Sequence, residues 1–208
     1  MRLRFKPNAI PEMEKNKYIY FDGSENKGRW QEIFGNNNPI HLEIGAGMGD
    51  FITQKALLNP EINYIALEMN TNAFVVASRK ILDEEIENVR GLIANAENLE
   101  EIFEKGEIDK IYLNFSTPWP KTRHHKRRLS HKRFLDRYTN IVKDKANLEL
   151  KTDNEEFFDA SLEYFSDYNM DIKEVNRNLY VEESIVTEYE SKFRNKEMPI
   201  FFVKASFR

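Results

Sequence analysis

The chain has 208 residues, a length typical of one large domain with a full hydrophobic core. Its formal net charge of −4 argues against a general polyanion binder, so any nucleic-acid site must be a local basic patch. The lack of cysteine excludes disulfides and cysteine-based zinc sites, and the lack of a long apolar run or a signal-peptide core predicts a cytoplasmic protein without membrane spans.

The first 38 residues are polar and irregular, with a basic start that includes Arg2 and Arg4. This start fits a solvated tail better than a nucleic-acid contact. The pattern predicts one short helix over 28–34, in which Trp30 and Phe34 stand four residues apart and cover the core from one side.

A glycine-rich turn follows the first predicted strand, Ile40–Ile44. It contains Gly45, Gly47 and Gly49 and leads into a helix that ends near Leu58. A strand, a glycine turn and a helix N-terminus together are typical of a nucleotide site, because glycine lets a ligand approach the backbone.

The spacing of this turn differs from the dinucleotide fingerprint, which would need its third glycine where the chain has Asp50. A nicotinamide-dependent enzyme is therefore disfavoured. Instead, an acidic residue, Glu43, stands two positions before the first glycine.

Polar residues also end the next two predicted strands. Strand 62–67 ends at Glu68, about 20 residues past the glycine turn, where an acidic side chain can accept both hydroxyls of a ribose. Strand 89–94 ends at Asn95 and Ala96, where Asn95 either meets an adenine edge or caps a helix. A helix over 71–87 is predicted between the two strands.

The most unusual segment is 114–133, which follows the predicted strand 108–115. Pro118 and Pro120 flank Trp119 and exclude a helix there. From residue 121 to residue 133 the run is cationic, without one acidic side chain. We call this run, residues 121–133, the cationic arm. A rigid aromatic turn beside it suits a nucleic-acid base and its phosphates. The competing interpretation is a solvated basic loop.

The remaining pattern continues to alternate helices and strands. Helices are predicted over 96–105, 132–142, 154–165 and 185–193, and strands over 146–151, 170–175 and 200–205. Alternation of this kind favours an open, mostly parallel α/β sheet. Such sheets bind ligands at the carboxyl ends of their strands, near a topological switch point, which is where every candidate residue falls.

Five motifs carry a resemblance to a known family. They are HLEIGAGMGDF (41–51), YIALEMN (64–70), NFSTPWPKTRHHKRRL (114–129), ELKTDN (149–154) and TEYESKF (187–193). With these motifs the chain resembles the tRNA (guanine-N7-)-methyltransferases, a family of class I S-adenosylmethionine-dependent enzymes. The third and fifth motifs are the specific ones.

The resemblance implies a three-layer, doubly wound, Rossmann-like α/β fold with a seven-stranded sheet, mostly parallel, whose last strand is antiparallel. Residues 39–208 would form one methyltransferase domain, and residues 1–38 an extension that packs on or near the RNA face. The expected activity is methyl transfer from S-adenosylmethionine to N7 of a guanosine in the tRNA variable loop, at position 46. The expected partner is tRNA, without membrane or metal, and a homodimer is left open.

The resemblance also implies site residues. Those expected to bind the cofactor are Glu43, Gly45, Gly47, Gly49, Glu68, Asn95, Ala96 and Thr117. Those expected to contact RNA are Trp119, Lys121, Arg123, His124, His125, Lys126, Arg127, Arg128, Asp153, Thr187, Glu188, Tyr189 and Glu190. His124, His125 and His131 would extend a phosphate-facing surface rather than bind a metal.

One position departs from the family pattern. The family has an aspartate, usually given the central catalytic role, where this chain has Thr117. Guanine N7 carries no proton to remove, so we expect an active enzyme in which Asp153 or Glu190 supplies the missing charge. The alternatives are a tRNA-binding module that no longer catalyses and a methyltransferase of a small molecule or protein, which would have no use for the cationic arm.

Overall fold

The computed structural model describes residues 5–208, so Arg2 and Arg4 lie outside the described part. Its strands are β1 (Ile19–Phe21), β2 (Ile40–Ile44), β3 (Asn63–Glu68), β4 (Val89–Ile93), β5 (Ile108–Asn114), β6 (Val142–Thr152), β7 (Asp171–Asn176) and β8 (Phe201–Ser206). Its α-helices are α1 (Ala9–Met13), α2 (Trp30–Phe34), α3 (Asp50–Leu58), α4 (Thr71–Asp83), α5 (Leu99–Ile102), α6 (Lys132–Thr139), α7 (Glu155–Asp167) and α8 (Glu188–Arg194). Short 3-10 turns are η1 (Ser24–Asn26), η2 (Ala96–Asn98), η3 (Thr122–Arg127) and η4 (Val181–Glu183).

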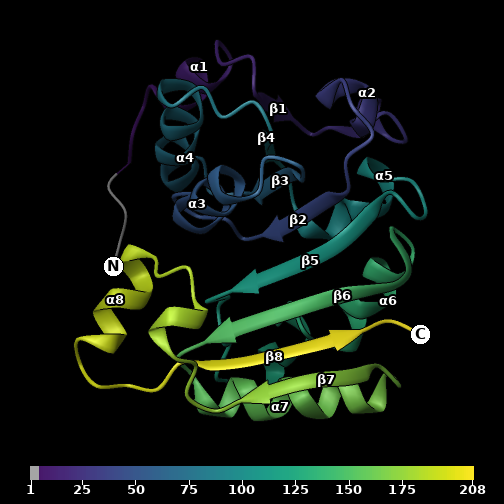
Figure 1. Ribbon diagram of the computed structural model, residues 1–208, viewed down its shortest axis with the longest axis vertical. Helices are drawn as coiled ribbons and strands as arrows, with labels where there is room; N and C mark the ends of the chain where they lie inside the picture. The colour runs from purple at the N-terminus through teal and green to yellow at the C-terminus, as the bar shows by residue number, and fades with distance from the viewer. Residues whose placement is uncertain (1–4) are drawn as a thin grey trace.

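These strands form one sheet in the order β1-β4-β3-β2-β5-β6-β8-β7 (Figure 1). All neighbours run parallel except β8, which is antiparallel to both β6 and β7. The predicted mostly parallel α/β sheet with an antiparallel last strand is therefore confirmed, and all seven predicted strands are present.

The sheet has one strand more than the sequence predicts. β1 comes from the segment expected to be irregular and pairs with β4 at the edge, Tyr20 opposite Leu92. Three residues are too few to show the alternation by which a strand is recognised. The extension is held to the domain elsewhere as well, since the Asn16 side chain donates to the Ser78 backbone oxygen at 2.8 Å.

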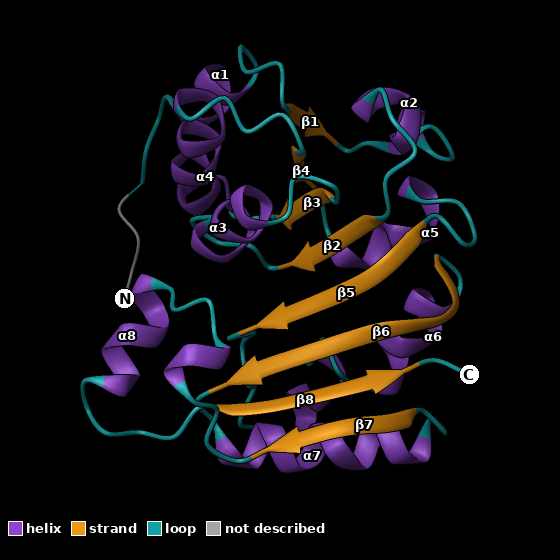
Figure 2. Cartoon of the chain, viewed as in Figure 1, coloured by secondary structure: helices purple, strands orange, loops and turns teal. Residues whose placement is uncertain are grey.

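Helices cover both faces of the sheet (Figure 2). Helices α1, α3 and α4 bury one apolar cluster against one face, and α2, α5, α6 and α7 bury a larger cluster against the other. The predicted role of Trp30 is confirmed, because its ring is fully buried and its Nε1 donates to the Ile102 backbone oxygen at 3.1 Å. In the described part of the chain no helix combines the length and apolar character that a membrane span requires.

The strand order indicates which edge of the sheet binds a ligand. β2 pairs with both β3 and β5, so the order in which strands are added along the sheet reverses between β2 and β5. The carboxyl ends of β2, β5 and β6 point to the left edge in Figure 1, where α8 also lies. Ligands of open α/β sheets bind at such a switch point.

Candidate active site

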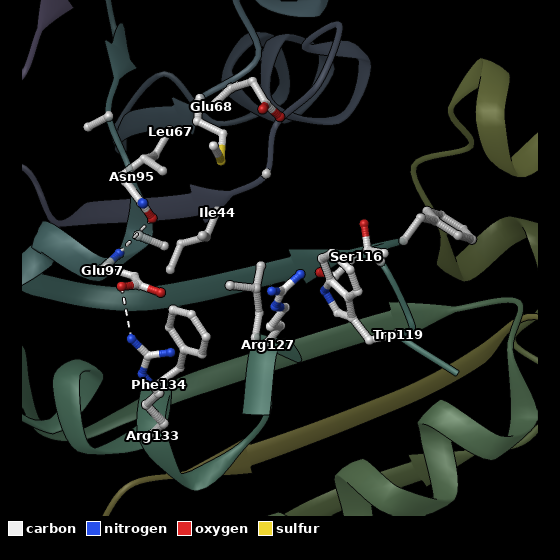
Figure 3. Close-up of a pocket in the computed structure, with 17 residues that line it drawn as sticks. Ile44, Leu67, Glu68, Asn95, Glu97, Ser116, Trp119, Arg127, Arg133 and Phe134 are labelled. Carbon is white, nitrogen blue, oxygen red and sulfur yellow. Dashed lines mark hydrogen bonds and ion pairs between the residues drawn. The ribbon is translucent and has the colours of Figure 1, made fainter. Parts of the chain in front are cut away.

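A cavity of about 670 Å³ opens at the carboxyl ends of β2, β3, β4 and β5 (Figure 3). The predicted residues that line it are Gly45, Glu68, Asn95, Ala96, Thr117, Trp119 and Arg127. A smaller cavity of about 280 Å³ adjoins it, since Gly45 and Phe115 line both. The structure thus brings together side chains from five separate stretches of the sequence.

The glycine turn gives the two cavities their shared wall. Gly45, Gly47 and Gly49 have φ angles of 83°, 57° and 77°, which side chains other than glycine rarely adopt. A Cβ atom at Gly45 or Gly47 would meet no atom within 4 Å, whereas one at Gly49 would lie 2.6 Å from the Ala77 Cβ. Gly45 and Gly47 therefore leave space for a ligand, and Gly49 allows α3 to pack on α4.

This difference predicts two distinct variants. Gly45→Ala is expected to cost only about 1–2 kcal/mol of stability, from its positive φ, and to weaken cofactor binding because the new methyl group enters the cavity. Gly49→Ala is expected to destabilise the protein more, because the helices must move apart. Urea unfolding and calorimetric titration of S-adenosylmethionine would measure both effects. Equal unfolding free energies for the two variants would contradict the assignment.

Glu68 and Asn95 are held in place by backbone groups. Glu68 Oε2 accepts from the Gly47 N–H at 3.0 Å, and its Oε1 accepts from the Asn70 N–H at 2.8 Å. The Asn95 side chain accepts from the Glu97 N–H at 3.0 Å, so the helix-cap interpretation is confirmed while the residue also lines the cavity. Fixed carboxylate and amide groups of this kind can accept and donate to a ribose and a base edge.

Glu43 is a buried carboxylate with one oxygen unused. Its Oε1 accepts from the Asn114 amide at 2.9 Å, whereas its Oε2 has no partner in the described chain. Burial raises the pKa of Glu43 to about 7, a change that the Asn114 hydrogen bond and the nearby Lys151 ammonium oppose. The side chain lines the smaller cavity, so a buried acceptor without a partner in the described chain stands beside that cavity.

The turn after β5 is strained. Phe115 and Trp119 have φ angles of 49° and 45°, an unusual conformation for bulky residues. The Phe115 ring packs on Tyr189 of α8 at a centroid distance of 5.2 Å. Between Phe115 and Trp119 in the chain, Ser116 Oγ is buried and has no hydrogen-bond partner among the described residues, and Thr117 is exposed at the cavity.

The cationic arm lies beside the cavity. The Arg127 guanidinium lies 5.0 Å from the Trp119 ring centre, and the His124 ring lies 5.7 Å from it. Lys121, Arg123 and Lys126 are exposed, and His125 is partly buried. Within residues 5–208 no three His, Asp or Glu side chains gather as a metal site would require.

Arg128 and Glu190 occupy different places from those expected. Arg128 is 1% exposed, and its guanidinium points to the turn rather than to solvent. Glu190 is fully buried and pairs with Lys151 and Arg194, each at 2.6 Å. Neither side chain can contact RNA from these positions, and the Glu190 charge is already neutralised, so it cannot supply the charge that Thr117 lacks.

The other predicted site residues of the C-terminal half differ in burial and in the cavity they line. Thr187 and Tyr189 line the smaller cavity, where Thr187 Oγ1 also caps α8 by accepting from the Glu190 N–H. Glu188 is exposed and pairs with Lys192 at 2.7 Å. Asp153 directly follows β6 and is half-buried, outside the lining of both cavities, and burial raises its pKa.

Sequence reasoning missed three contributors: Asn114, Phe115 and Lys151. Asn114 and Lys151 are polar residues that follow buried apolar residues at the carboxyl ends of β5 and β6, which is the signal that could have identified them. No local pattern shows the strained φ of Phe115.

Known proteins resemble this chain over its whole length. A family model described as "Putative methyltransferase" matches residues 37–203. A Listeria innocua protein named tRNA (guanine-N(7)-)-methyltransferase is 48% identical, in an alignment that covers 100% of this chain and 99% of that protein. A Streptococcus agalactiae protein of the same name is 44% identical, with 100% of both chains covered.

Solved structures share the fold. An antibiotic-related methyltransferase has a TM-score of 0.70 at 20% identity, covering 93% of this chain and 98% of its own. A SAM-dependent methyltransferase from Aquifex aeolicus has a TM-score of 0.60 at 15% identity, covering 99% and 100%. From its sequence relatives, the chain belongs to the tRNA (guanine-N(7)-)-methyltransferase family.

Proposed function

We propose that this protein transfers a methyl group from S-adenosylmethionine to N7 of a guanosine in tRNA, at position 46 of the variable loop. The observation that supports the proposal most strongly is that one cavity is lined both by residues expected to bind the cofactor and by residues expected to bind RNA. Its lining includes Gly45 of the glycine turn with Glu68 and Asn95, and also Trp119 and Arg127 of the cationic arm and the turn before it. Cofactor and RNA would therefore meet at the same place.

The residues present fit this cofactor. The open space beside Gly45 and Gly47 admits a ligand against the backbone, and Glu68 and Asn95 would hold its ribose and adenine. The unused oxygen of Glu43 would accept from its amino group. When bound, S-adenosylmethionine supplies an electrophilic methyl group on a sulfonium.

The chain has little proton chemistry to perform. Guanine N7 has a free lone pair and carries no proton, so no general base is needed. Positioning of two reactants can supply up to roughly 7–11 kcal/mol of barrier reduction. Thr117, exposed at the cavity, would orient a base edge through its hydroxyl. Asp153, half-buried beyond the lining of both cavities, would supply longer-range negative charge for the developing purinium.

The RNA surface would consist of the exposed arm and the start of α8. The residues that we assign to it are the exposed Lys121, Arg123, Lys126, Arg127, Glu188 and Tyr189, the partly buried Trp119, His124, His125 and Asp153, and the buried Thr187, which lines the smaller cavity. Of the predicted extension 1–38, the described residues 5–38 would pack near this surface. We also expect a cytoplasmic protein. A second copy of the chain is compatible with this arrangement, and a sedimentation experiment would determine the oligomeric state.

Methyl transfer to unmodified tRNA tests the proposal. We expect labelled S-adenosylmethionine to yield N7-methylguanosine in the digested tRNA, and a transcript with adenosine at tRNA position 46 to accept no label. Label in another nucleoside, or equal label in both transcripts, would contradict the assignment. Binding of cofactor and tRNA without product would instead support the non-catalytic binding module.

A further inference from the structure

The turn that carries Thr117 lacks its own backbone support. In the described chain, residues 116–120 make no backbone–backbone hydrogen bond, although Trp119 is held at a φ of 45°. Pro118 and Pro120 have no N–H group to donate, so the turn cannot be closed from within at those positions. Something outside the turn must hold it.

The Arg128 side chain provides the hydrogen bonds. Its Nε donates to the Pro118 backbone oxygen at 2.8 Å, and its Nη2 donates to the Trp119 oxygen at 3.5 Å and to Glu156 of α7 at 3.2 Å. The guanidinium lies 5.7 Å from the Phe157 ring centre and is 1% exposed. A planar fork of donors is suited to holding two successive carbonyls.

We propose that Arg128 is a positioning residue for methyl transfer. This proposal rests on the proposed function above. The role of Arg128 differs from that of the neighbouring cations. Arg128 connects the turn to α7 and so fixes the places of Thr117 and Trp119 at the cavity, whereas Lys126 and Arg127 are exposed toward RNA. A guanidinium without access to solvent cannot release a counterion from tRNA.

The two roles predict opposite kinetics. Loss of a phosphate contact would weaken tRNA binding and lower the salt slope by about 1, with little change at saturating tRNA. Loss of positioning would leave that slope unchanged and lower the rate of the chemical step, by about 10²-fold for a displacement near 1 Å.

The experiment compares Arg128→Met, Arg128→Lys and a matched control, Arg177→Met. Arg177 is about half exposed and likewise lies over a ring of α7, with Glu155 and Asp159 as partners. We expect both Arg128 variants to lose about 10²-fold in single-turnover rate at saturating tRNA and cofactor, with a wild-type salt slope, and the control to lose nothing. Lysine keeps the charge but lacks the fork, so it should not rescue.

Fluorine spectroscopy gives a second, activity-free readout. Labelling with 5-fluorotryptophan marks both tryptophans, and Trp30, fully buried in the core, reports on folding. A Trp119→Phe variant would assign the two signals. We expect the Arg128 variants to shift or broaden the Trp119 signal while the Trp30 signal stays in place.

Three results would overturn the proposal. They are an unchanged rate with weakened tRNA binding, an unchanged Trp119 signal in both variants, and a Trp30 signal that moves together with that of Trp119 in both variants. The last would make Arg128 a general folding residue. If the wild type transferred no methyl group, the proposed function would fail, but the fluorine signals would still decide whether Arg128 holds the turn.

Discussion

Glu43→Gln is expected to stabilise the free protein at pH 8 and to weaken its binding of S-adenosylmethionine. The variant keeps an oxygen that can accept from Asn114, but it has no charge to bury. The opposite effects on stability and binding would show that the Glu43 carboxylate is kept for the ligand.

The stability effect follows from the raised pKa. A change from 4.5 to about 7 means that the folded state holds the Glu43 proton more tightly than the unfolded state does. The contribution of Glu43 to stability therefore falls as pH rises from 4.5 to about 7, by about 3 kcal/mol in total. The variant lacks this fall, so its advantage should be largest above pH 7 and should vanish below pH 4.5.

The binding effect has the opposite sign. A hydrogen bond to a charged group contributes about 1.5–3 kcal/mol, so the variant should bind about 10–150-fold more weakly. Wild-type affinity should rise as pH increases through about 7, with release of a proton, and the variant should show no such rise. Titration calorimetry in buffers of different ionisation enthalpy measures both. An unaltered affinity, or a variant less stable at pH 8, would contradict the role of Glu43.

Lys151→Met is expected to destabilise the protein by about 3 kcal/mol, the low end for breaking a buried ion pair. Lys151 Nζ donates to Glu190 at 2.6 Å and to Ser184 Oγ at 2.9 Å, and its side chain is 5% exposed. Without it, the fully buried Glu190 keeps Arg194 as its one ionic partner among the described residues, which is why we expect the low end.

The same lysine connects α8 to the active site. Its ammonium lies 5.5 Å from the ring centre of Phe115, whose ring packs on Tyr189. We therefore expect the variant to bind tRNA and cofactor more weakly as well, because Phe115, which lines both cavities, loses a supporting contact.

Urea unfolding would test the stability effect in a double-mutant cycle with Glu190→Gln. Removing both charges should recover part of the loss, because no unpaired carboxylate remains buried. Lys143→Met is the matched control, since Lys143 is about half exposed and pairs with Asp109. It should change stability by less than about 0.5 kcal/mol. A Lys151→Met loss no larger than that of the control would refute the prediction.

Local patterns predicted the sheet and the inner wall of the cavity. The glycine turn and Glu68 follow apolar strands, and parallel strands bring their carboxyl ends together, so topology alone gathers these groups. The interactions that form the sheet and this wall join residues that are close in sequence, or repeat along one helix or strand. β1 was missed because three residues show no period.

Arg128 and Glu190 could not be placed from the sequence. Arg128 belongs to a run of cations, and its partners Pro118 and Glu156 lie 10 and 28 residues away. Glu190 lies on a short helix whose pattern resembles a solvated surface, and its partner Lys151 is 39 residues away. Burial of a charge depends on such distant partners, which composition and periodicity do not reveal.

We infer that this chain is an active enzyme although Thr117 stands where the resemblance of its motifs implies an aspartate. The most direct test is the single-turnover rate of N7-methylguanosine formation on the same unmodified tRNA, for the wild type and for Thr117→Asp. We predict product from both, with the wild type slower by no more than about 10²–10³-fold, the effect of one stabilising group. Product from Thr117→Asp but none from the wild type would contradict the claim and identify a tRNA-binding module whose catalysis has been lost.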